Sequence, residues 1–213
     1  VATKPADAAI PALDVHDKPA LIFRTFDSHP HGEWANAAAA LKKDVSVKTD
    51  QWIDHSAGYL VPKDLYYDEH PDWYAMRKDG KRVAKDAFTY HRTPLCLSNA
   101  EMTKVAAARA LDWVQEQPHS TFFPITYGDT GLWCQCPACR KLDPAPRQYA
   151  ARLLHWVNPI AKAIAAKHPD KIVVTFAYGG SDAPPADVPV ADNVHICLAV
   201  PFAGLVFWDH SKD

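Results

Sequence analysis

Lys171–Tyr178 reads KIVVTFAY, a continuous apolar run with the length and the β-branched and aromatic content of a buried strand. Further runs of this kind follow the same pattern and are expected to be strands: Leu21–Phe26 (LIFRTF), Pro94–Leu97 (PLCL), Thr121–Tyr127 (TFFPITY) and Val194–Val200 (VHICLAV). Pro124 cannot donate a ladder hydrogen bond, so we expect a bulge there. Strands without apolar–polar alternation indicate a parallel sheet buried on both faces.

Helices are expected between these strands. Ser98 and Glu101 have the spacing of a capping box, which predicts a helix that begins there and ends before Pro118. Residues 148–168 keep one face apolar for five turns, and Pro159 within them predicts a kink. The order of strands and helices therefore predicts an α/β protein.

Two parallel architectures remain, an open doubly wound sheet and a closed barrel. Neither GxGxxG nor GxxxxGK[ST] occurs, although nucleotide-binding sheets usually carry such a turn. The sequence thus favours a (β/α)8 TIM-type barrel. We expect the barrel to be incomplete in this chain, because only five or six strands are expected and a full barrel has eight strands in about 250 residues. We expect an irregular N-terminal lead-in over residues 1–19 and a partial barrel-type catalytic domain over residues 20–213.

Composition excludes some classes of partner. The chain has 213 residues, 48% of them hydrophobic, and a net charge of −2. It has no basic stripe and no apolar run of about 18 residues, so neither nucleic acid nor a membrane is an expected partner. Aromatic residues make up 11% of the chain, and they can either stack on the faces of sugar rings or build the core.

Candidate catalytic residues lie where the expected strands end, since a barrel carries its chemistry there. Asp129 directly follows an apolar strand and lies between Gly128 and Gly131, so we expect it to act as an acid or an acid/base. An Asx turn or a helix cap is the alternative for this side chain. Glycosidases use two carboxyls, and the second could be Asp54, Asp182 or Asp209, or could lie beyond residue 213.

A sugar subsite is expected beside Asp129. Aromatic and polar side chains near the strand ends would line it: His55, Tyr59, Trp133 and Tyr178.

The chain has five cysteines, and three of them form the pattern Cys134-Gln135-Cys136-Pro137-Ala138-Cys139. This pattern supplies three metal ligands, and Cys96, Cys197 or a histidine could supply a fourth. A disulfide or buried thiols are favoured over a zinc site, and we expect neither a metal nor another cofactor. Catalytic metal patterns such as HExxH are absent.

Several segments resemble a bacterial family known as domain of unknown function 4838. They are Asp54-His55, residues 59–83, PLCLSNAEM (94–102), YGDTGLWCQCPACRKLD (127–143) and residues 153–171. The resemblance implies a glycoside-hydrolase-like barrel of the α-glucuronidase and hexosaminidase sort, in exported bacterial proteins of carbohydrate metabolism. The family often has Asn where this chain has Gly128, so a side chain that could orient a substrate is missing here.

The main functional hypothesis is a glycoside hydrolase that acts on a polysaccharide or glycan from a periplasmic or extracellular location. The alternative is a non-catalytic carbohydrate-binding barrel, which keeps aromatic platforms but lacks a working carboxyl pair. A third interpretation makes the cysteine-rich loop a zinc-stabilised interaction surface. The sequence leaves the oligomeric state open.

Overall fold

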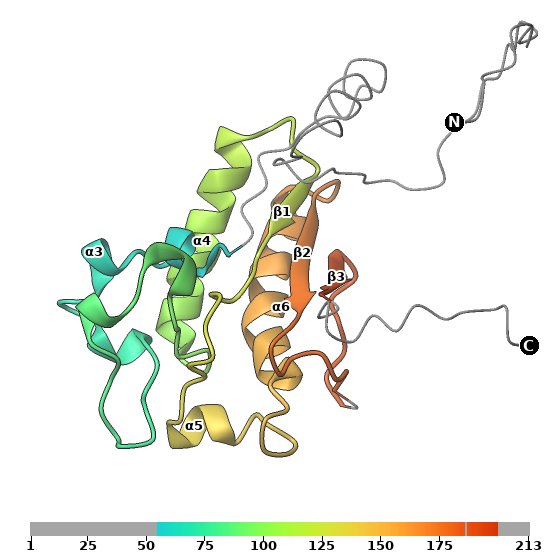
Figure 1. Cartoon of the computed structure of the whole chain (residues 1–213). Coiled ribbons are helices and arrows are strands. Elements are labelled where there is room, and N and C mark those ends of the chain that lie inside the picture. Colours follow the sequence, from blue (N-terminus) through green and yellow to red (C-terminus); the bar gives the residue numbers. More distant parts are fainter. Residues whose placement is uncertain (1–54, 186, 200–213) are drawn as a thin grey trace, which may run out of the picture. The chain divides into compact units, whose positions relative to one another are not determined.

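Figure 1 shows a computed structural model of the chain, which describes residues 55–185 and 187–199. All of them belong to one compact unit, Asp50–Asp213. The helices are α2 (Ala57–Leu60), α3 (Lys63–Tyr66), α4 (Ala100–Glu116), α5 (Pro137–Arg140) and α6 (Ala150–Lys167), with 3-10 turns η1 (Pro71–Trp73), η2 (Lys85–Ala87) and η3 (Tyr90–Arg92). The strands are β1 (Phe122–Pro124), β2 (Ile172–Ala177) and β3 (Val194–Leu198).

The three strands form a parallel sheet in the order β1-β2-β3. Phe123 of β1 lies opposite Val173, and Val173 lies opposite Val194 of β3. Beyond the ladder, the Lys171 ammonium donates to the carbonyl oxygen of Pro118 at 2.7 Å, which ties the entrance of β2 to the loop before β1. The expected strands at 121–127, 171–178 and 194–200 are therefore present, with shorter bounds.

The predicted TIM-type barrel is wrong. Within the described residues the sheet has three strands and does not close on itself, because β1 and β3 each pair with β2 alone. Pro94–Leu97 is not a strand and contributes one antiparallel bridge, between Tyr74 and Leu95. The predicted bulge is also wrong, since Pro124 pairs with Val174 in an uninterrupted register. Leu21–Phe26 lies outside the described residues.

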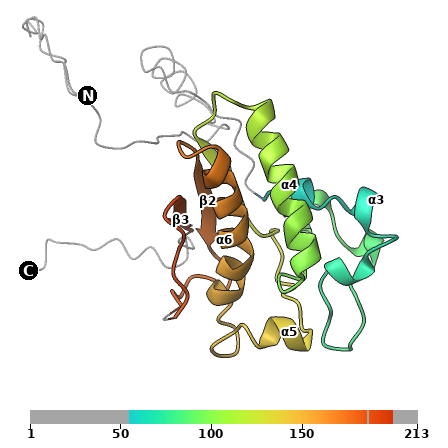
Figure 2. The ribbon, with the colours of Figure 1, turned by 180° about the vertical axis from the view of Figure 1, so that it is seen from behind.

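Helices α4 and α6 pack against each other, and α6 also contacts β2. In Figure 1 α6 lies behind β2, and in Figure 2, seen from the other side, it lies in front, so it covers one face of the sheet. The core between them contains large side chains from both helices, among them Trp113 of α4 and Trp156 of α6, both at most 1% exposed. Trp113 meets Phe123 of β1 edge to face at 5.5 Å. Burial of such rings stabilises this layer by about 1.5–3 kcal/mol for each large side chain.

The N-terminus of α4 differs from the predicted capping box. Asn99 is the N-cap, and its side-chain oxygen accepts the backbone N–H of Met102 at 2.9 Å. Asn and Ser cap helices about equally well, so the sequence alone did not separate Asn99 from Ser98. The Ser98 hydroxyl instead lies 3.2 Å from the sulfur atom of Cys139.

Pro159 lies inside α6, which continues past it to Lys167. Proline removes the hydrogen bond to the carbonyl of His155 four residues earlier. Both His155 and Pro159 are exposed, so that carbonyl is on the solvent side of the helix and water can satisfy it. The apolar face, with Ile160 and Ile164 fully buried, stays intact.

Asp79-Gly80 forms a turn, as is typical of this dipeptide. The N–H of Gly80 donates to the carbonyl of Arg77 at 3.1 Å, and Gly80 has a positive φ of 79°. Among the described helices, none is both long and apolar enough to span a bilayer.

Candidate functional site at the carboxyl ends of the strands

An open pocket lies at the edge of the sheet where all three strands end. It has a volume of about 700 Å³, within the range of ligand sites. Its lining comes from the loop after β1, the loop after β2, the end of β3 and η3: Arg92, Asp129, Thr130, Gly131, Tyr178, Gly179, Gly180, Asp182, Leu198 and Ala199. Crevices at the carboxyl ends of parallel strands are where open α/β sheets bind ligands.

Asp129 and Tyr178 are hydrogen-bonded to each other across this pocket. The Tyr178 hydroxyl donates to Oδ1 of Asp129 at 3.2 Å, and the backbone N–H of Asp129 donates to the carbonyl of His91 at 2.8 Å. The hydrogen bond to the Asp129 carboxylate, followed by the charge of that carboxylate, raises the pKa of Tyr178. Tyr178 is 44% exposed, so its ring remains accessible to a ligand. The pair thus offers a carboxyl group beside an open aromatic ring.

Gly128 places Asp129 by allowing two backbone segments to touch. A Cβ atom at this position would lie 2.5 Å from the carbonyl oxygen of Thr93 and 2.8 Å from its nitrogen. No side chain fits there unless the backbone moves, which gives a physical reason for glycine at position 128. Gly58 meets the same segment, since its Cβ would lie 2.3 Å from the carbonyl oxygen of Tyr90. Residues 90–93 are therefore held between two glycines.

His55 lies behind Tyr178. Its Nδ1 is 2.9 Å from the carbonyl oxygen of Tyr127, and its ring centroid is 6.4 Å from that of Tyr178 and 5.7 Å from that of Phe176. His55 does not line the pocket in this structure but supports the ring that does.

Tyr59 does not line the pocket either. Its hydroxyl donates to Oε2 of Glu116 at 3.1 Å, and its ring packs 5.0 Å from that of Trp113. Burial, followed by the hydrogen bond to Glu116, raises the pKa of Tyr59. This tyrosine joins α2 to α4.

Trp133 is buried, with 6% of its surface exposed. Its ring is stacked between Tyr127 at 4.4 Å and Tyr149 at 4.5 Å, so protein covers both of its faces. The indole N–H donates to the carbonyl of Gly179 at 3.1 Å. Trp133 therefore has no free face for a sugar in this arrangement and instead supports the glycine turn that borders the pocket.

Arg152 adds a charge to this aromatic stack. It is fully buried, lies 5.0 Å from the ring centroid of Tyr149, and forms a bidentate ion pair with Asp143. It also donates to the carbonyl of Cys134 at 2.7 Å. Burial raises the pKa of Asp143 although the Arg152 guanidinium opposes the shift. The group fixes the loop that follows Asp129.

Two further charged residues line the pocket beside Asp129, and only one of them was a candidate from the sequence. Asp182 was one of the possible second carboxylates, and it lines the pocket together with Asp129. Arg92 was missed, because it lies in an irregular segment without periodicity, and no local signal places that segment beside the strand ends. Asp54 and Asp209 lie outside the described residues.

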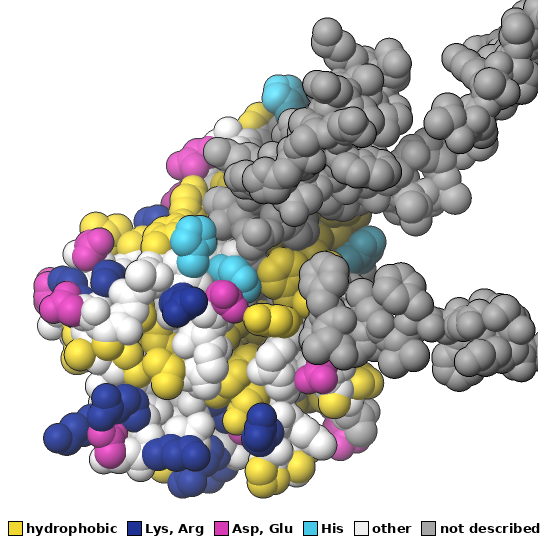
Figure 3. Space-filling view, viewed as in Figure 1, with side chains coloured by type: hydrophobic (Ala, Val, Ile, Leu, Met, Phe, Trp, Pro, Cys, Tyr) yellow, Lys and Arg dark blue, Asp and Glu magenta, His cyan; other side chains and the backbone are white. Residues whose placement is uncertain are grey.

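The surface in Figure 3 shows where charged groups gather. Near the middle of this view, histidine, basic and acidic side chains lie beside one another and next to apolar ones. Basic side chains gather at the lower edge of the same view. The mixture of charges gives the described surface no extended basic stripe in this view.

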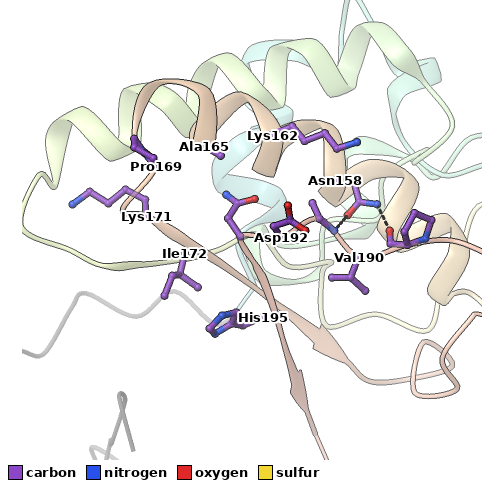
Figure 4. Close-up of a pocket in the computed structure, with 12 residues that line it drawn as sticks. Asn158, Lys162, Ala165, Pro169, Lys171, Ile172, Val190, Asp192 and His195 are labelled. Carbon is purple, nitrogen blue, oxygen red and sulfur yellow. Dashed lines mark hydrogen bonds between the residues drawn. The ribbon is translucent and has the colours of Figure 1, made fainter.

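Figure 4 shows a second concavity, of about 590 Å³, near the start of β2 and β3. Its polar side chains already serve neighbouring loops: Asn158 donates to the carbonyl of Pro189 at 2.9 Å and accepts the N–H of Ala191 at 3.1 Å. Lys171 is likewise occupied by Pro118. This concavity is therefore a less suitable ligand site than the pocket at the strand ends.

Four cysteines form a buried group near the loop after β1. Their sulfur atoms all lie within 4.8 Å of one another, and we call Cys96, Cys134, Cys136 and Cys139 the Cys cluster. Hydrogen bonds from the neighbouring thiols, that of Cys134 first, lower the pKa of Cys96, while hydrogen bonds to Cys134 and Cys96 raise that of Cys139. The sequence left the partner of the CxCxxC pattern open, and the structure selects Cys96. Cys197 is exposed and lies outside the Cys cluster.

Comparison with protein families matches residues 3–202 of the chain to the model described as Domain of unknown function (DUF4838). The chain belongs to this family. No curated protein and no solved structure matches it.

Proposed function

We propose that the domain binds a polysaccharide or glycan in the pocket at the strand ends and hydrolyses it with Asp129 as acid or acid/base. The observation that carries the proposal is that Asp129, Asp182 and the exposed ring of Tyr178 line one open pocket. Glycoside cleavage needs carboxyl groups to transfer protons, and an aromatic ring beside them can hold the apolar face of a sugar.

Each side chain has a separate task in this proposal. In its protonated form Asp129 gives the proton on Oδ2 to the glycosidic oxygen as the bond from that oxygen to the anomeric carbon breaks. Tyr178, which donates to Oδ1 of Asp129, holds the carboxyl in place. Asp182 is the second carboxyl, acting either on the sugar directly or through water. Arg92, which is exposed and also lines the pocket, binds substrate oxygens through its guanidinium.

The loop backbone favours close approach of a ligand. Gly179 and Gly180 have positive φ angles of 59° and 95°, a conformation that other residues adopt at a cost. Their turn leaves the pocket rim without side chains next to Tyr178. A sugar ring placed on Tyr178 would therefore contact backbone polar groups directly.

The test uses the full chain and a panel of polysaccharides. Asp129→Asn is expected to lower turnover by about 100-fold or more, as for loss of an acid/base group, while glycan binding stays intact. Asp182→Asn is expected to lower turnover as well. Asp192→Asn is the matched control, because Asp192 lies in the other concavity and not in this pocket. Equal turnover in Asp129→Asn and the unchanged chain would overturn the catalytic assignment.

A binding module without catalysis is the second candidate, favoured by the exposed ring of Tyr178. In that case the unchanged chain binds a glycan without hydrolysing it, and Tyr178→Ala weakens binding at least tenfold. Binding that is unaffected by Tyr178→Ala and by Arg92→Ala would exclude this pocket from both functions.

We also propose an exported location, periplasmic or extracellular, because polymeric glycans are met outside the cytoplasm. Fractionation of the native host with an antibody against the chain tests this. Recovery from the cytoplasm alone would contradict it.

A further inference from the structure

The Cys cluster has the geometry of a metal site rather than of a disulfide. The sulfur of Cys96 lies 3.7 Å from that of Cys136 and 3.8 Å from that of Cys139. A tetrahedral Zn²⁺ site with Zn–S bonds of about 2.3 Å has sulfur atoms about 3.8 Å apart. Sulfur atoms joined in a disulfide lie about 2.05 Å apart. These two separations, together with the 4.8 Å within which all four sulfur atoms lie, agree with four ligands around one central position.

The ligands come from two segments of the chain, with Cys96 and Cys136 40 positions apart. Cys96 follows the residue that bridges to Tyr74, whereas the other three lie in the loop after β1 and in α5. All four are buried. A buried thiol alone packs as a small hydrophobic group, but four thiols within 4.8 Å of one another offer each other only weak hydrogen-bond partners.

Hydrogen-bond donors surround the cluster. The backbone N–H of Met76 donates to the sulfur of Cys134 at 3.2 Å, and that of Cys139 donates to the sulfur of Cys136 at 3.4 Å. The Ser98 hydroxyl lies 3.6 Å from the sulfur of Cys96 and 3.7 Å from that of Cys136. Donors of this kind stabilise thiolates and orient them toward a metal.

A positive side chain completes the surroundings. Nη1 of Arg82 lies 3.9 Å from the sulfur of Cys134 and donates to the carbonyl of Tyr74 at 2.8 Å. Four thiolates around a divalent cation carry a net charge of −2, so a guanidinium at this distance offsets part of that charge. Arg82 therefore lies where a positive charge would stabilise a metal–thiolate centre.

From these contacts we propose that the Cys cluster binds one Zn²⁺ ion as a structural tetrathiolate centre. Soft thiolate ligands in a tetrahedron select zinc or iron, and zinc needs no redox partner. Four protein ligands close the coordination sphere, which is typical of structural rather than catalytic zinc. None of the four cysteines lines the pocket that contains Asp129, so this centre is independent of the proposed hydrolysis.

The role of the metal follows from what it connects. It joins the segment before α4, through Cys96, to the loop that carries Trp133 and to α5. α5 has four residues and is too short to be stable alone. Zinc would therefore supply the free energy that folds this loop, since binding to a site absent from the unfolded chain adds directly to folding.

The experiment is metal analysis of the full chain purified under reducing conditions without chelators. We expect about one zinc ion per chain by plasma mass spectrometry. Replacement by Co²⁺ is expected to give the intense sulfur-to-cobalt charge-transfer bands and the visible bands of a tetrahedral tetrathiolate site. Protein mass under non-reducing, denaturing conditions is expected to show free thiols.

Variants separate the cluster from other thiols. Cys136→Ser and Cys139→Ser are expected to lose zinc binding by at least 100-fold, and Cys197→Ser, at an exposed position outside the cluster, is the control that keeps it. If the cluster variants do not fold, the cobalt spectrum of the unchanged chain still decides. Absence of zinc together with absence of tetrathiolate bands on cobalt addition would overturn the proposal, and so would disulfides within the cluster of the natively isolated protein.

Discussion

The backbone of Thr93 occupies the space that a side chain at Gly128 would need. Its carbonyl oxygen lies 2.5 Å from the ideal Cβ position of residue 128, and its nitrogen lies 2.8 Å from the same position. Because backbone atoms cannot rotate away as the end of a side chain can, this contact fixes the loop between β1 and the pocket. Asp129 follows directly, so the position of its carboxyl depends on that contact.

We therefore expect Gly128→Ala to destabilise the fold by about 1–3 kcal/mol, the usual cost of overpacking a close contact. Gly131→Ala is the matched control, since a Cβ there meets nothing within 4 Å. Urea unfolding of the two variants and of the unchanged chain measures the difference. Equal midpoints for both variants would show that residues 92–93 can yield.

The hydrogen bond between Tyr178 and Asp129 predicts a change in titration. The pKa of Tyr178 is raised above 10.0 chiefly by its hydrogen bond to the Asp129 carboxylate, so Asp129→Asn is expected to lower it toward that value. Ring ¹³C chemical shifts followed against pH, and assigned with Tyr178→Phe, measure the change. Asp192→Asn is expected to leave the titration unaltered.

The raised pKa of Tyr178 also fixes how the stability of the fold depends on pH. The folded chain holds the Tyr178 proton more tightly than the unfolded chain does. The contact therefore contributes stability that is fully present below pH about 10 and is lost as the pH rises through the folded-state pKa. A Tyr178 pKa that does not respond to Asp129→Asn would show that the two side chains do not interact in solution.

Asp143 is expected to be indispensable to the buried Arg152. Asp143→Asn leaves a fully buried guanidinium without a counter-charge, and loss of one partner of such a pair costs about 3–5 kcal/mol. Thermal and urea unfolding measure this loss. Asp79→Asn, in the exposed pair with Arg77, is the control and is expected to have a much smaller effect.

A double variant separates pairing from burial at the same site. Burial raises the pKa of Asp143 despite the adjacent guanidinium, which indicates that desolvation outweighs pairing there. Asp143→Leu combined with Arg152→Met is therefore expected to be more stable than Asp143→Asn alone. The opposite order would show that the hydrogen bond from Arg152 to the carbonyl of Cys134 is the dominant contact.

The strands were predictable where their apolar runs were long and rich in β-branched residues. The run at 171–178 contains β2, but the run at 94–97 is an irregular segment with one bridge, because four apolar residues fit a buried loop equally well. Closure into a barrel is not encoded in any local pattern. It depends on how many strands pair, and the described sheet has three.

The site was predictable in part for the same reason. Asp129 and Tyr178 follow parallel neighbouring strands, and such strands end at one edge of a sheet, so their proximity followed from the strand order. The burial of Trp133 between two tyrosines did not follow, since sequence shows that a loop aromatic exists but not which groups cover its faces. The choice of Cys96 likewise required the fold, because it lies 40 positions from Cys136.

The hydrogen bond from Lys171 to Pro118 joins residues 53 positions apart, and it forms only when β2 lies beside β1. Closing so long a loop costs chain entropy before any hydrogen bond of the sheet can form, and this slows folding. Helix α6 lies within that interval and packs against α4. Docking of α6 on α4 brings the start of β2 close to β1, so we expect the two helices to associate in the folding transition state and the strands to pair afterwards.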